Sequence, residues 1–115
     1  MKPTIALFMG DPAGIGPELV VKLLADGTAA KAARIVLLGS RPVLDEAMKV
    51  AGVTFDVAVG GESEIADLTG KGPMLLRWPG MDADGFERGK VTPKNGRFML
   101  DALKIGLDLC QRNVA

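Results

Sequence analysis

The chain has 115 residues, 14 of them basic and 14 acidic, so its formal net charge at pH 7 is zero. This balance provides no electrostatic basis for binding nucleic acid or an anionic membrane. No apolar run is long enough to cross a bilayer, no secretory signal opens the chain, and its single cysteine cannot form an internal disulfide. We therefore expect one cytoplasmic unit over residues 1–115.

Apolar runs of strand length alternate along the chain with segments whose apolar residues have helical spacing. This alternation is typical of a parallel or mixed α/β sheet. The predicted strands are 3–9, 34–38, 54–59 and 73–78. The predicted helices are 17–25, 41–51 and 96–112, with a further short helical turn at 64–68. A small-residue connection over 27–33 and a long irregular segment over 79–95 complete the prediction.

Apolar spacing also predicts which helical side chains form the core. In the first helix these are Leu19, Leu23 and the pair Val20/Leu24. In the last helix, one face contains Met99, Ala102, Leu103, Gly106 and Cys110, broadened by Phe98, Ile105 and Leu109. Because Cys110 lies on that face, we expect a buried and unreactive thiol. Asn95 is predicted to cap this helix.

A glycine-rich segment follows the first predicted strand and reads Gly10-Asp11-Pro12-Ala13-Gly14-Ile15-Gly16-Pro17-Glu18. Its glycines allow close backbone approach, and we expect a positive φ angle at Gly14 or Gly16. Pro17 suits the first helical position, and Glu18 adds negative charge to the first turn. Asp11 lies where open α/β sheets bind ligands; alternatively, it caps the turn through nearby backbone N–H groups.

This segment differs from the known phosphate-binding loops. A phosphate site requires free N–H groups and positive charge at the helix start, whereas Pro17 removes a donor and Glu18 adds repulsion. Leu19 stands where a dinucleotide fingerprint has its third glycine, and no Gly-Lys-Ser/Thr follows. A Rossmann-type phosphate site is therefore not expected, and a turn that holds no ligand remains an alternative.

Other chemical signals are few. The sequence has no histidine, which excludes a histidine-bound metal, a Ser-His-Asp triad and a histidine base within this chain. Trp78 is interpreted as an anchor in the core or at its rim. The basic residues around the long loop provide either solvated charge or attraction for an anionic phosphorylated ligand; they are Arg88, Lys90, Lys94 and Arg97. Acidic pairs are interpreted as solvated surface, and they are Asp45/Glu46, Glu62/Glu64 and Asp82/Asp84.

The segment Gly10–Glu18, placed directly after an N-terminal strand, resembles the opening signature of the 4-hydroxythreonine-4-phosphate dehydrogenase family of vitamin B6 (pyridoxine) biosynthesis. It is more distantly similar to the Gly-Asp-Gly-Ile-Gly-Pro-Glu loop of isopropylmalate and isocitrate dehydrogenases, with Pro-Ala inserted after the aspartate. The segments 37–40 and 89–96 also fit the family. The resemblance covers essentially the whole chain, but only about the first third of a family member.

The resemblance implies an isopropylmalate/isocitrate dehydrogenase-like α/β/α sheet and an oxidoreductase that uses NAD and a divalent metal (Zn, Mg or Co). Such enzymes oxidise and decarboxylate 4-phosphohydroxy-L-threonine or a related phosphorylated hydroxy acid, and they are homodimers. The loop would lie beside the cofactor, which gives Asp11, Gly14, Ile15 and Gly16 as the cofactor-binding residues. The metal ligands are expected outside this chain.

Two interpretations follow. In the first, residues 1–115 are the N-terminal part of such a dehydrogenase, inactive alone and exposing apolar surface to a missing portion or partner. In the second, they are a free-standing, non-catalytic α/β module that binds a partner or a small molecule.

Overall fold

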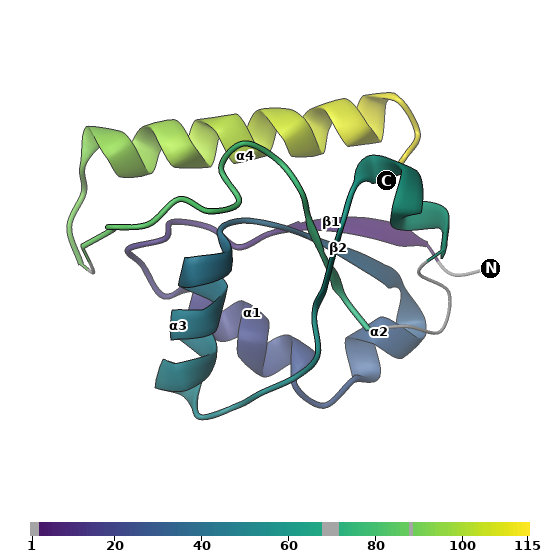
Figure 1. Ribbon diagram of the computed structural model, residues 1–115, viewed down its shortest axis with the longest axis horizontal. Coiled ribbons are helices and arrows are strands. Elements are labelled where there is room, and N and C mark those ends of the chain that lie inside the picture. Colours follow the sequence, from purple (N-terminus) through teal and green to yellow (C-terminus); the bar gives the residue numbers. More distant parts are fainter. Residues whose placement is uncertain (1–2, 68–71, 88) are drawn as a thin grey trace.

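Four parallel strands form the centre of the fold, in the order β1-β2-β4-β3 (Figure 1). This computed structural model describes residues 3–67, 72–87 and 89–115. The strands are β1 (Thr4–Phe8), β2 (Arg34–Leu38), β3 (Ala58–Gly60) and β4 (Met74–Leu76). All three strand pairs are parallel, which confirms the predicted sheet class. The third strand is shorter than predicted and shifted toward its C-terminal end, because it pairs with β4 only over Ala58–Gly60.

The central strand β2 carries two separate hydrophobic cores, one on each face of the sheet. Ile35 and Leu37 join the cluster on one face, whereas Val36 and Leu38 join the cluster on the other. Successive side chains of a strand point to opposite faces, so a strand covered on both sides is apolar throughout. The continuous apolar run of β2 is therefore explained by its position inside three layers.

Helices cover the two faces unequally. On one face lie α1 (Gly16–Leu24), α2 (Thr28–Ala32) and α3 (Arg41–Ala51). On the other lie α4 (Pro93–Gln111) and the 3-10 helix η1 (Glu62–Asp67), which contribute Leu109 and Ile65 to the second core. The residue Leu68, predicted to end the η1 turn, lies outside the described residues. In the described part of the chain, no helix has both the length and the apolarity needed to cross a membrane.

The prediction for the first helix was correct in position but partly wrong in its buried face. Leu19 and Leu23 are 58% and 57% exposed, whereas Val20 and Leu24 are buried. The buried set also includes Pro17 and Val21. An apolar run covers more than one side of a helix, and only the packing of α1 on the sheet and α3 selects the side that is buried.

The same ambiguity affected α4. Its buried residues are Asn95, Phe98, Ala102 and Leu109. Leu103 is 46% exposed, and Cys110 is exposed as well, so the predicted buried thiol is wrong. Phe98 and Leu109 were predicted to lie at the margin of the buried face. They are instead at its centre, where they pack against the long loop and the sheet.

Two local predictions were also wrong. Thr92, not Asn95, caps α4, and its side chain accepts a hydrogen bond from the Asn95 backbone N–H. Segment 27–33 is largely helical rather than a simple connection, because its alanines favour a helix once Asp26 accepts from the Thr28 N–H at 2.9 Å. That hydrogen bond also lowers the pKa of Asp26.

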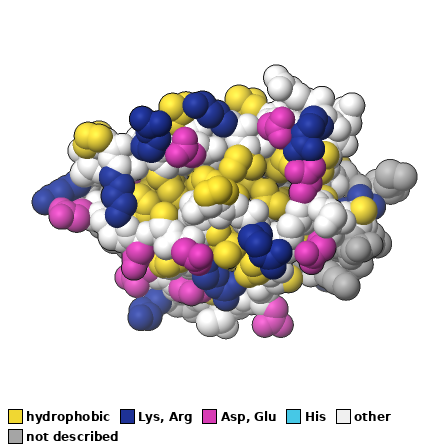
Figure 2. Space-filling view, turned by 45° about the horizontal axis from the view of Figure 1, so that its top comes forward, with side chains coloured by type: hydrophobic (Ala, Val, Ile, Leu, Met, Phe, Trp, Pro, Cys, Tyr) yellow, Lys and Arg dark blue, Asp and Glu magenta, His cyan; other side chains and the backbone are white. Residues whose placement is uncertain are grey.

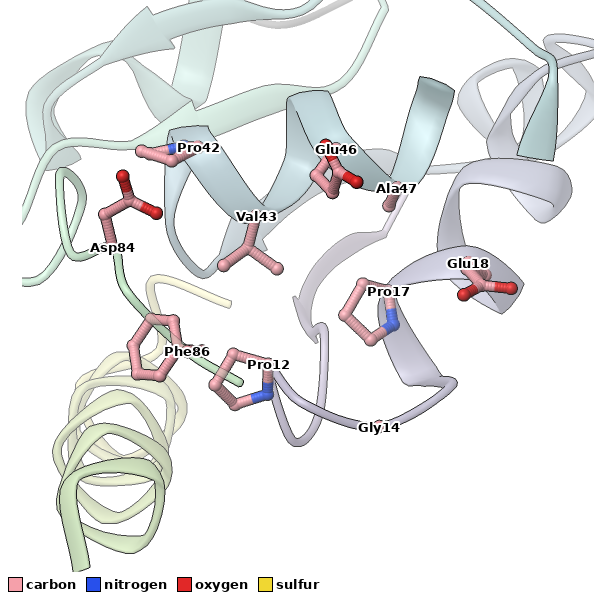
Figure 3. A pocket seen from close by; sticks show the side chains of 10 residues that line it. All are labelled: Pro12, Gly14, Pro17, Glu18, Pro42, Val43, Glu46, Ala47, Asp84 and Phe86. Carbon is pink, nitrogen blue, oxygen red and sulfur yellow. The ribbon is translucent and has the colours of Figure 1, made fainter. Parts of the chain in front are cut away.

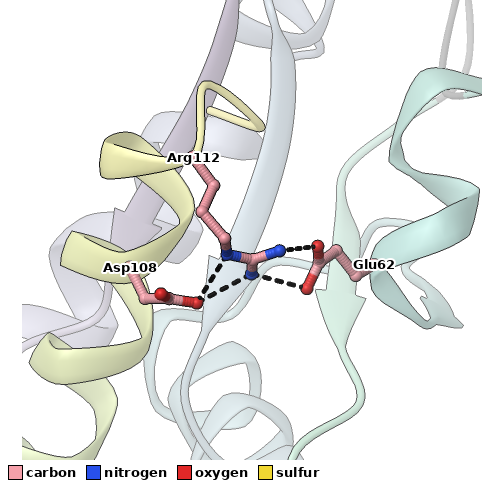
Figure 4. Close-up of polar contacts among 3 residues, drawn as sticks. All are labelled: Glu62, Asp108 and Arg112. Carbon is pink, nitrogen blue, oxygen red and sulfur yellow. Dashed lines mark hydrogen bonds and ion pairs between the residues drawn. The ribbon is translucent and has the colours of Figure 1, made fainter.

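A surface ion-pair network fastens the end of α4 to η1 (Figure 4). The Arg112 guanidinium donates to both carboxylate oxygens of Glu62, at 2.5 and 2.8 Å. The same guanidinium donates from Nε to Asp108 Oδ2 at 2.9 Å. The hydrogen bonds from Arg112 lower the pKa of Glu62 below its ordinary value and raise that of Arg112.

This network should make stability depend on pH in the acid range. A carboxylate whose pKa is lowered by folding stabilises the native state above its unfolded pKa, and that stabilisation is lost as the pH falls through the folded pKa. We therefore expect the wild-type chain to have a larger unfolding free energy than Glu62→Gln at neutral pH. This difference should disappear as the pH falls below the ordinary carboxyl pKa of 4.5 and through the lowered pKa of Glu62. Urea unfolding at several pH values measures it; an advantage that stays constant into acid would contradict the role of Glu62.

Candidate active site

The three chain segments that the sequence singled out meet at the carboxyl edge of the sheet. β1 leads into the glycine-rich loop, 10–18, and β2 leads into the Gly39–Ser40 turn. The third segment, 89–96, begins α4 and reaches the same place, since Gly89 donates its backbone N–H to the Ala13 carbonyl at 2.8 Å. Ligands of open α/β sheets bind at this edge, so the convergence marks a candidate site.

The glycine-rich loop is closed by its own aspartate. Asp11 Oδ1 accepts from the Ala13 N–H at 2.9 Å, and the Asp11 carbonyl accepts from the Gly14 N–H at 2.9 Å. The predicted capping role of Asp11 is therefore confirmed.

The glycines have different roles from those predicted. Neither Gly14 nor Gly16 has a positive φ; that conformation occurs at Gly10, with φ +83°. Gly16 is required for space, since a Cβ there would lie 2.4 Å from the Met9 carbonyl oxygen. Gly14 has ordinary room, because its nearest neighbour would be Asp11 Cβ at 3.4 Å. The prediction of a strained angle at Gly14 or Gly16 was wrong because the tight point is a close approach of backbones.

A buried amide connects the loop to the start of α4. Asn95 is 3% exposed, and its Nδ2 donates to Asp11 Oδ1 at 3.4 Å and to the Lys90 carbonyl at 3.0 Å. Its Oδ1 accepts from the Thr92 hydroxyl at 2.9 Å. The sequence indicated Asn95 only as a helix cap; its contact with a residue 84 positions away required the tertiary structure.

The loop that follows β4 is docked on the turn after β2. The Trp78 indole N–H donates to the Gly39 carbonyl at 2.9 Å, and its ring lies 5.4 Å from the Phe98 ring. The buried Ser40 hydroxyl donates to the Ala83 carbonyl, and the Arg41 N–H donates to the Met81 carbonyl at 2.6 Å. Trp78 is thus an anchor, as predicted, and the segment predicted as irregular is held against the sheet edge.

A small cavity of about 80 Å³ lies between the glycine-rich loop, the first half of α3 and the docked loop (Figure 3). Polar and apolar atoms line it in equal measure, and three of the lining residues carry carboxylates: Glu18, Glu46 and Asp84. Of the described lining residues none is basic. Pockets for drug-sized ligands measure roughly 300–1,000 Å³, so this cavity can hold only part of a dinucleotide. Its charge disfavours a phosphate group.

A larger groove of about 380 Å³ lies on the other side of the docked loop, against α4. Its mainly apolar lining includes Trp78, Phe86 and Phe98, together with three charged residues, Lys94, Arg97 and Asp101. Lys94 is engaged locally, because its ammonium group donates to the Asp84 carbonyl and lies 4.9 Å from the Phe86 ring centroid. Lys90 pairs with Glu87 at 2.6 Å, and Arg88 lies outside the described residues. Among the described members of the predicted basic cluster, Lys90 and Lys94 are therefore engaged locally, and Arg97 is the member left to attract an anion.

The donor set does not fit a resident metal. Within residues 3–67, 72–87 and 89–115, no group of three or more His, Cys, Asp or Glu side chains is placed to hold a metal ion. The sequence has no histidine anywhere. The acidic pairs predicted to be solvated are exposed, as expected. No residue of the described ranges is therefore assigned as a metal ligand.

A parallel α/β/α sheet with a glycine-rich strand-to-helix turn at its carboxyl edge defines the class, the isocitrate/isopropylmalate dehydrogenase-like fold of the chain's structural neighbours. The crystal structure of a 4-hydroxythreonine-4-phosphate dehydrogenase from Burkholderia phymatum superimposes on 99% of this chain, with a TM-score of 0.82 and 25% identity. The predicted fold class is thus confirmed. No family model matches the chain.

Curated relatives are likewise named as dehydrogenases of phosphorylated four-carbon hydroxy acids. A provisionally named 4-hydroxythreonine-4-phosphate dehydrogenase of Pseudomonas aeruginosa is 36% identical over 93% of this chain. The 4-hydroxythreonine-4-phosphate dehydrogenase of Trichlorobacter lovleyi is 30% identical over 95% of it. A provisionally named D-threonate 4-phosphate dehydrogenase of Clostridium botulinum is 27% identical over 96%. These findings confirm the resemblance inferred from Gly10–Glu18.

The matches cover nearly all of this chain but only about a third of each relative. The chain spans 32% of the Pseudomonas aeruginosa protein, 33% of the Trichlorobacter lovleyi protein and 34% of the Burkholderia phymatum chain. The names of these homologues as dehydrogenases support an oxidoreductase.

Proposed function

We propose that residues 1–115 are the N-terminal part of an NAD- and divalent-metal-dependent dehydrogenase that acts on a phosphorylated four-carbon hydroxy acid. The main support is the convergence of the three family-like segments, in which Asp11, Ala13 and Asn95 hold the glycine-rich loop against the start of α4. In the proposed reaction, a secondary alcohol would give a hydride to NAD and its hydroxyl proton to solvent, and the resulting β-keto acid would lose CO₂ and take up a proton. The metal ligands would come from outside these residues.

The charges of the site suggest how this part would contribute. The glycine-rich loop would form one wall of the cofactor site through Asp11, Gly14, Ile15 and Gly16. The carboxylates around the small cavity suit sugar hydroxyl groups better than a pyrophosphate, because they accept hydrogen bonds and repel anions. In the groove beside α4, Lys94 and Arg97 outnumber the single acidic lining residue, Asp101, so this groove is the better candidate for an anionic substrate, with Arg97 as its attracting cation.

The substrate class is supported by the relatives' names. Two of them name 4-hydroxythreonine-4-phosphate and a third names D-threonate 4-phosphate, both of which are four-carbon phosphorylated hydroxy acids. A role in vitamin B6 biosynthesis follows from the first substrate only. A cytoplasmic location and a homodimeric full-length enzyme are further parts of this proposal.

The direct test compares two preparations, the chain 1–115 alone and the longest native product of its reading frame. Each is assayed for NAD reduction with a divalent metal and either 4-phosphohydroxy-L-threonine or D-threonate 4-phosphate. We expect turnover only from a product that adds the missing two thirds. Turnover by the chain alone would contradict the assignment of the metal ligands to other residues.

A non-catalytic α/β module is the second candidate, and the absence of histidine favours it if the native protein proves to be this chain alone. The intact mass of the native protein separates the two candidates. A mass near 12.0 kDa, the mass of this chain, would support the module.

A substitution at Asp11 separates its role as a cap of the loop from a role in the cofactor site. In Asp11→Asn, the amide oxygen can still accept from Ala13 and Asn95, so we expect the unfolding free energy to change by less than about 1 kcal/mol. If Asp11 contributes charge to the cofactor site, NAD affinity of the active product falls while stability is retained. Unchanged affinity and turnover would leave Asp11 with the capping role alone.

A further inference from the structure

Three dipeptides in this chain join an aspartate or an asparagine to a glycine, and they are Asp26-Gly27, Asp84-Gly85 and Asn95-Gly96. In such a pair the glycine nitrogen can attack the carboxyl or amide carbon of the preceding side chain, because glycine has no side chain to hinder ring closure. The product is a five-membered succinimide, which water reopens to an ordinary or a β-linked (isoaspartyl) residue. The three pairs differ in how the fold holds the reacting groups.

The asparagine pair is protected by the start of α4. Asn95 is 3% exposed, and its carboxamide donates to Asp11 and to a backbone carbonyl. The Gly96 N–H is engaged as well, since it donates to the Thr92 carbonyl at 3.2 Å. Attack within this pair therefore requires the first turn of α4 to open.

The first aspartate pair is exposed but held apart. The Asp26 carboxylate accepts from the Thr28 N–H at 2.9 Å. The Gly27 N–H donates elsewhere, to the Leu24 carbonyl at 3.2 Å. Because the nitrogen and the carboxyl group each have another partner, exposure alone does not make this pair reactive.

Asp84-Gly85 has the opposite arrangement. Both residues are exposed, and the Gly85 N–H donates to Asp84 Oδ1 at 2.7 Å. They belong to the docked loop, where Figure 3 shows Asp84 at the border of the small cavity. The attacking nitrogen is thus already in contact with the carboxyl group that it has to attack, and such proximity speeds an intramolecular reaction.

A cation lies on the peptide group that reacts. The Lys94 ammonium group donates to the Asp84 carbonyl oxygen, which belongs to the same peptide bond as the Gly85 N–H. When that N–H loses its proton, negative charge spreads onto the carbonyl oxygen, and the ammonium group stabilises it there. In the succinimide, the same contact polarises the main-chain carbonyl, and attack of water on that carbonyl gives the β-linked product.

We propose that Asp84 is a site of spontaneous isoaspartate formation that Lys94 activates, with water as the only reagent. In the first step, the Gly85 nitrogen gives up its proton and bonds to Cγ of the protonated Asp84 carboxyl group, which releases water. In the second, water adds to the main-chain carbonyl carbon of residue 84, the bond from that carbon to the Gly85 nitrogen breaks, and the nitrogen regains its proton through the new link. The overall change is an isomerisation without a change in mass, and it does not depend on the proposed dehydrogenase function.

The modification would alter the boundary between the two pockets. The β-linked residue adds a methylene group to the main chain, between the backbone anchors of the docked loop at Ala83 and Gly89. It also moves the Asp84 carboxylate, which lines the small cavity. Phe86 lines both the cavity and the groove, so a longer main chain on its N-terminal side would shift a wall that the two pockets share.

The order of reactivity among the three pairs is the first test. In an unfolded chain, the asparagine pair should react fastest, because a carboxamide reacts as it stands whereas a carboxylate has to be protonated first. In the folded chain, products at Asp84 should accumulate at least about tenfold faster than at Asp26 or Asn95. Peptide mapping and labelling by an isoaspartyl methyltransferase measure each site, with and without guanidinium chloride. Equal rates at Asp84 and Asp26 in the folded chain would overturn the proposal.

Removal of the cation tests the role of Lys94. Lys94→Met should slow isoaspartate formation at Asp84 by about three- to tenfold, and Lys94→Arg should retain most of the rate. If Lys94 only held the loop in place, its loss would free the loop and speed the reaction instead. A faster or unchanged rate in Lys94→Met would therefore overturn the activating role.

Lys90→Met is the matched control. Lys90 lies nearby and pairs with Glu87 at 2.6 Å rather than with the reacting peptide group. At the end of the molecule where α4 begins, the left end in Figure 1, Figure 2 shows basic and acidic side chains close together on the surface. Loss of one such charge should change the rate by less than about twofold. Equal slowing in Lys90→Met and Lys94→Met would indicate a general effect of charge and contradict the specific contact.

Asp84→Glu confirms the reacting side chain. Glutamate keeps the negative charge, but its carboxyl group would have to close a six-membered ring, which forms far more slowly. The isoaspartate signal of this loop should therefore disappear in Asp84→Glu, while the rates at Asp26 and Asn95 stay as in the wild type. A signal that persists in the same peptide would come from a different aspartate, such as Asp82, and would overturn the assignment to Asp84.

Discussion

Replacing Gly16 with alanine should destabilise the chain by about 2 kcal/mol, an effect far larger than a surface substitution normally gives. The added Cβ would lie 2.4 Å from the Met9 carbonyl oxygen, and neither backbone can yield without moving β1 or α1. Alanine favours a helix over glycine by up to about 1 kcal/mol, and this gain offsets only part of the overlap. Urea unfolding followed by circular dichroism measures the difference.

Gly14→Ala is the matched control. Gly14 lies in the same loop, its φ is not positive, and its Cβ would meet Asp11 at ordinary contact distance. We expect a change of less than about 0.5 kcal/mol. Equal losses in the two variants would mean that the loop tolerates no side chain at either position, and the specific contact between Gly16 and Met9 would not be the cause.

Asn95→Leu should cost about 2–3 kcal/mol and loosen the junction between the glycine-rich loop and α4. The leucine has a similar volume but donates nothing, so Asp11 Oδ1 and the Lys90 carbonyl each lose a hydrogen bond in a partly buried place. Amide exchange should report the loosening first at Gly89, whose N–H donates to Ala13. Urea unfolding gives the total loss.

Gln111→Leu provides the comparison for Asn95→Leu, because Gln111 is an exposed amide on the same helix. It should change stability by less than about 0.5 kcal/mol. If Asn95→Leu unfolds at the same urea concentration as the wild type and the exchange of Gly89 is unchanged, Asn95 does not hold the two segments together.

The exposure of Leu103 and the exposure of Cys110 on α4 were both predicted wrongly, for the same physical reason. Apolar residues occupy most of the circumference of this helix, with charges confined to one flank. A helix of that composition can bury either side, and the periodicity alone gave the wrong one for Leu103 and Cys110. The packing of Phe98 against Trp78, and of Leu109 in the second core, selected the side that is buried.

The sequence by itself determined the class of fold and the position of most elements. The apolar run of β2, the proline and glycine boundaries of α3 and the nine residues Gly10–Glu18 are local signals, and local signals depend on backbone preferences that tertiary packing rarely reverses. The predicted start of α4 was three residues too late. Thr92 and Asn95 are both good caps, but Thr92 accepts from a helix N–H, whereas the Asn95 side chain bonds to Asp11 and the Lys90 carbonyl.

Only the tertiary structure decided what these signals do together. Nothing in the sequence indicates that Asn95 bonds to Asp11, that Trp78 bonds to Gly39, or that the three family-like segments share one sheet edge. Those contacts join residues 39 and 84 positions apart, and their partners depend on the order β1-β2-β4-β3. Residue preferences act over a few positions, whereas strand order and helix facing are set by how the whole chain buries its two cores.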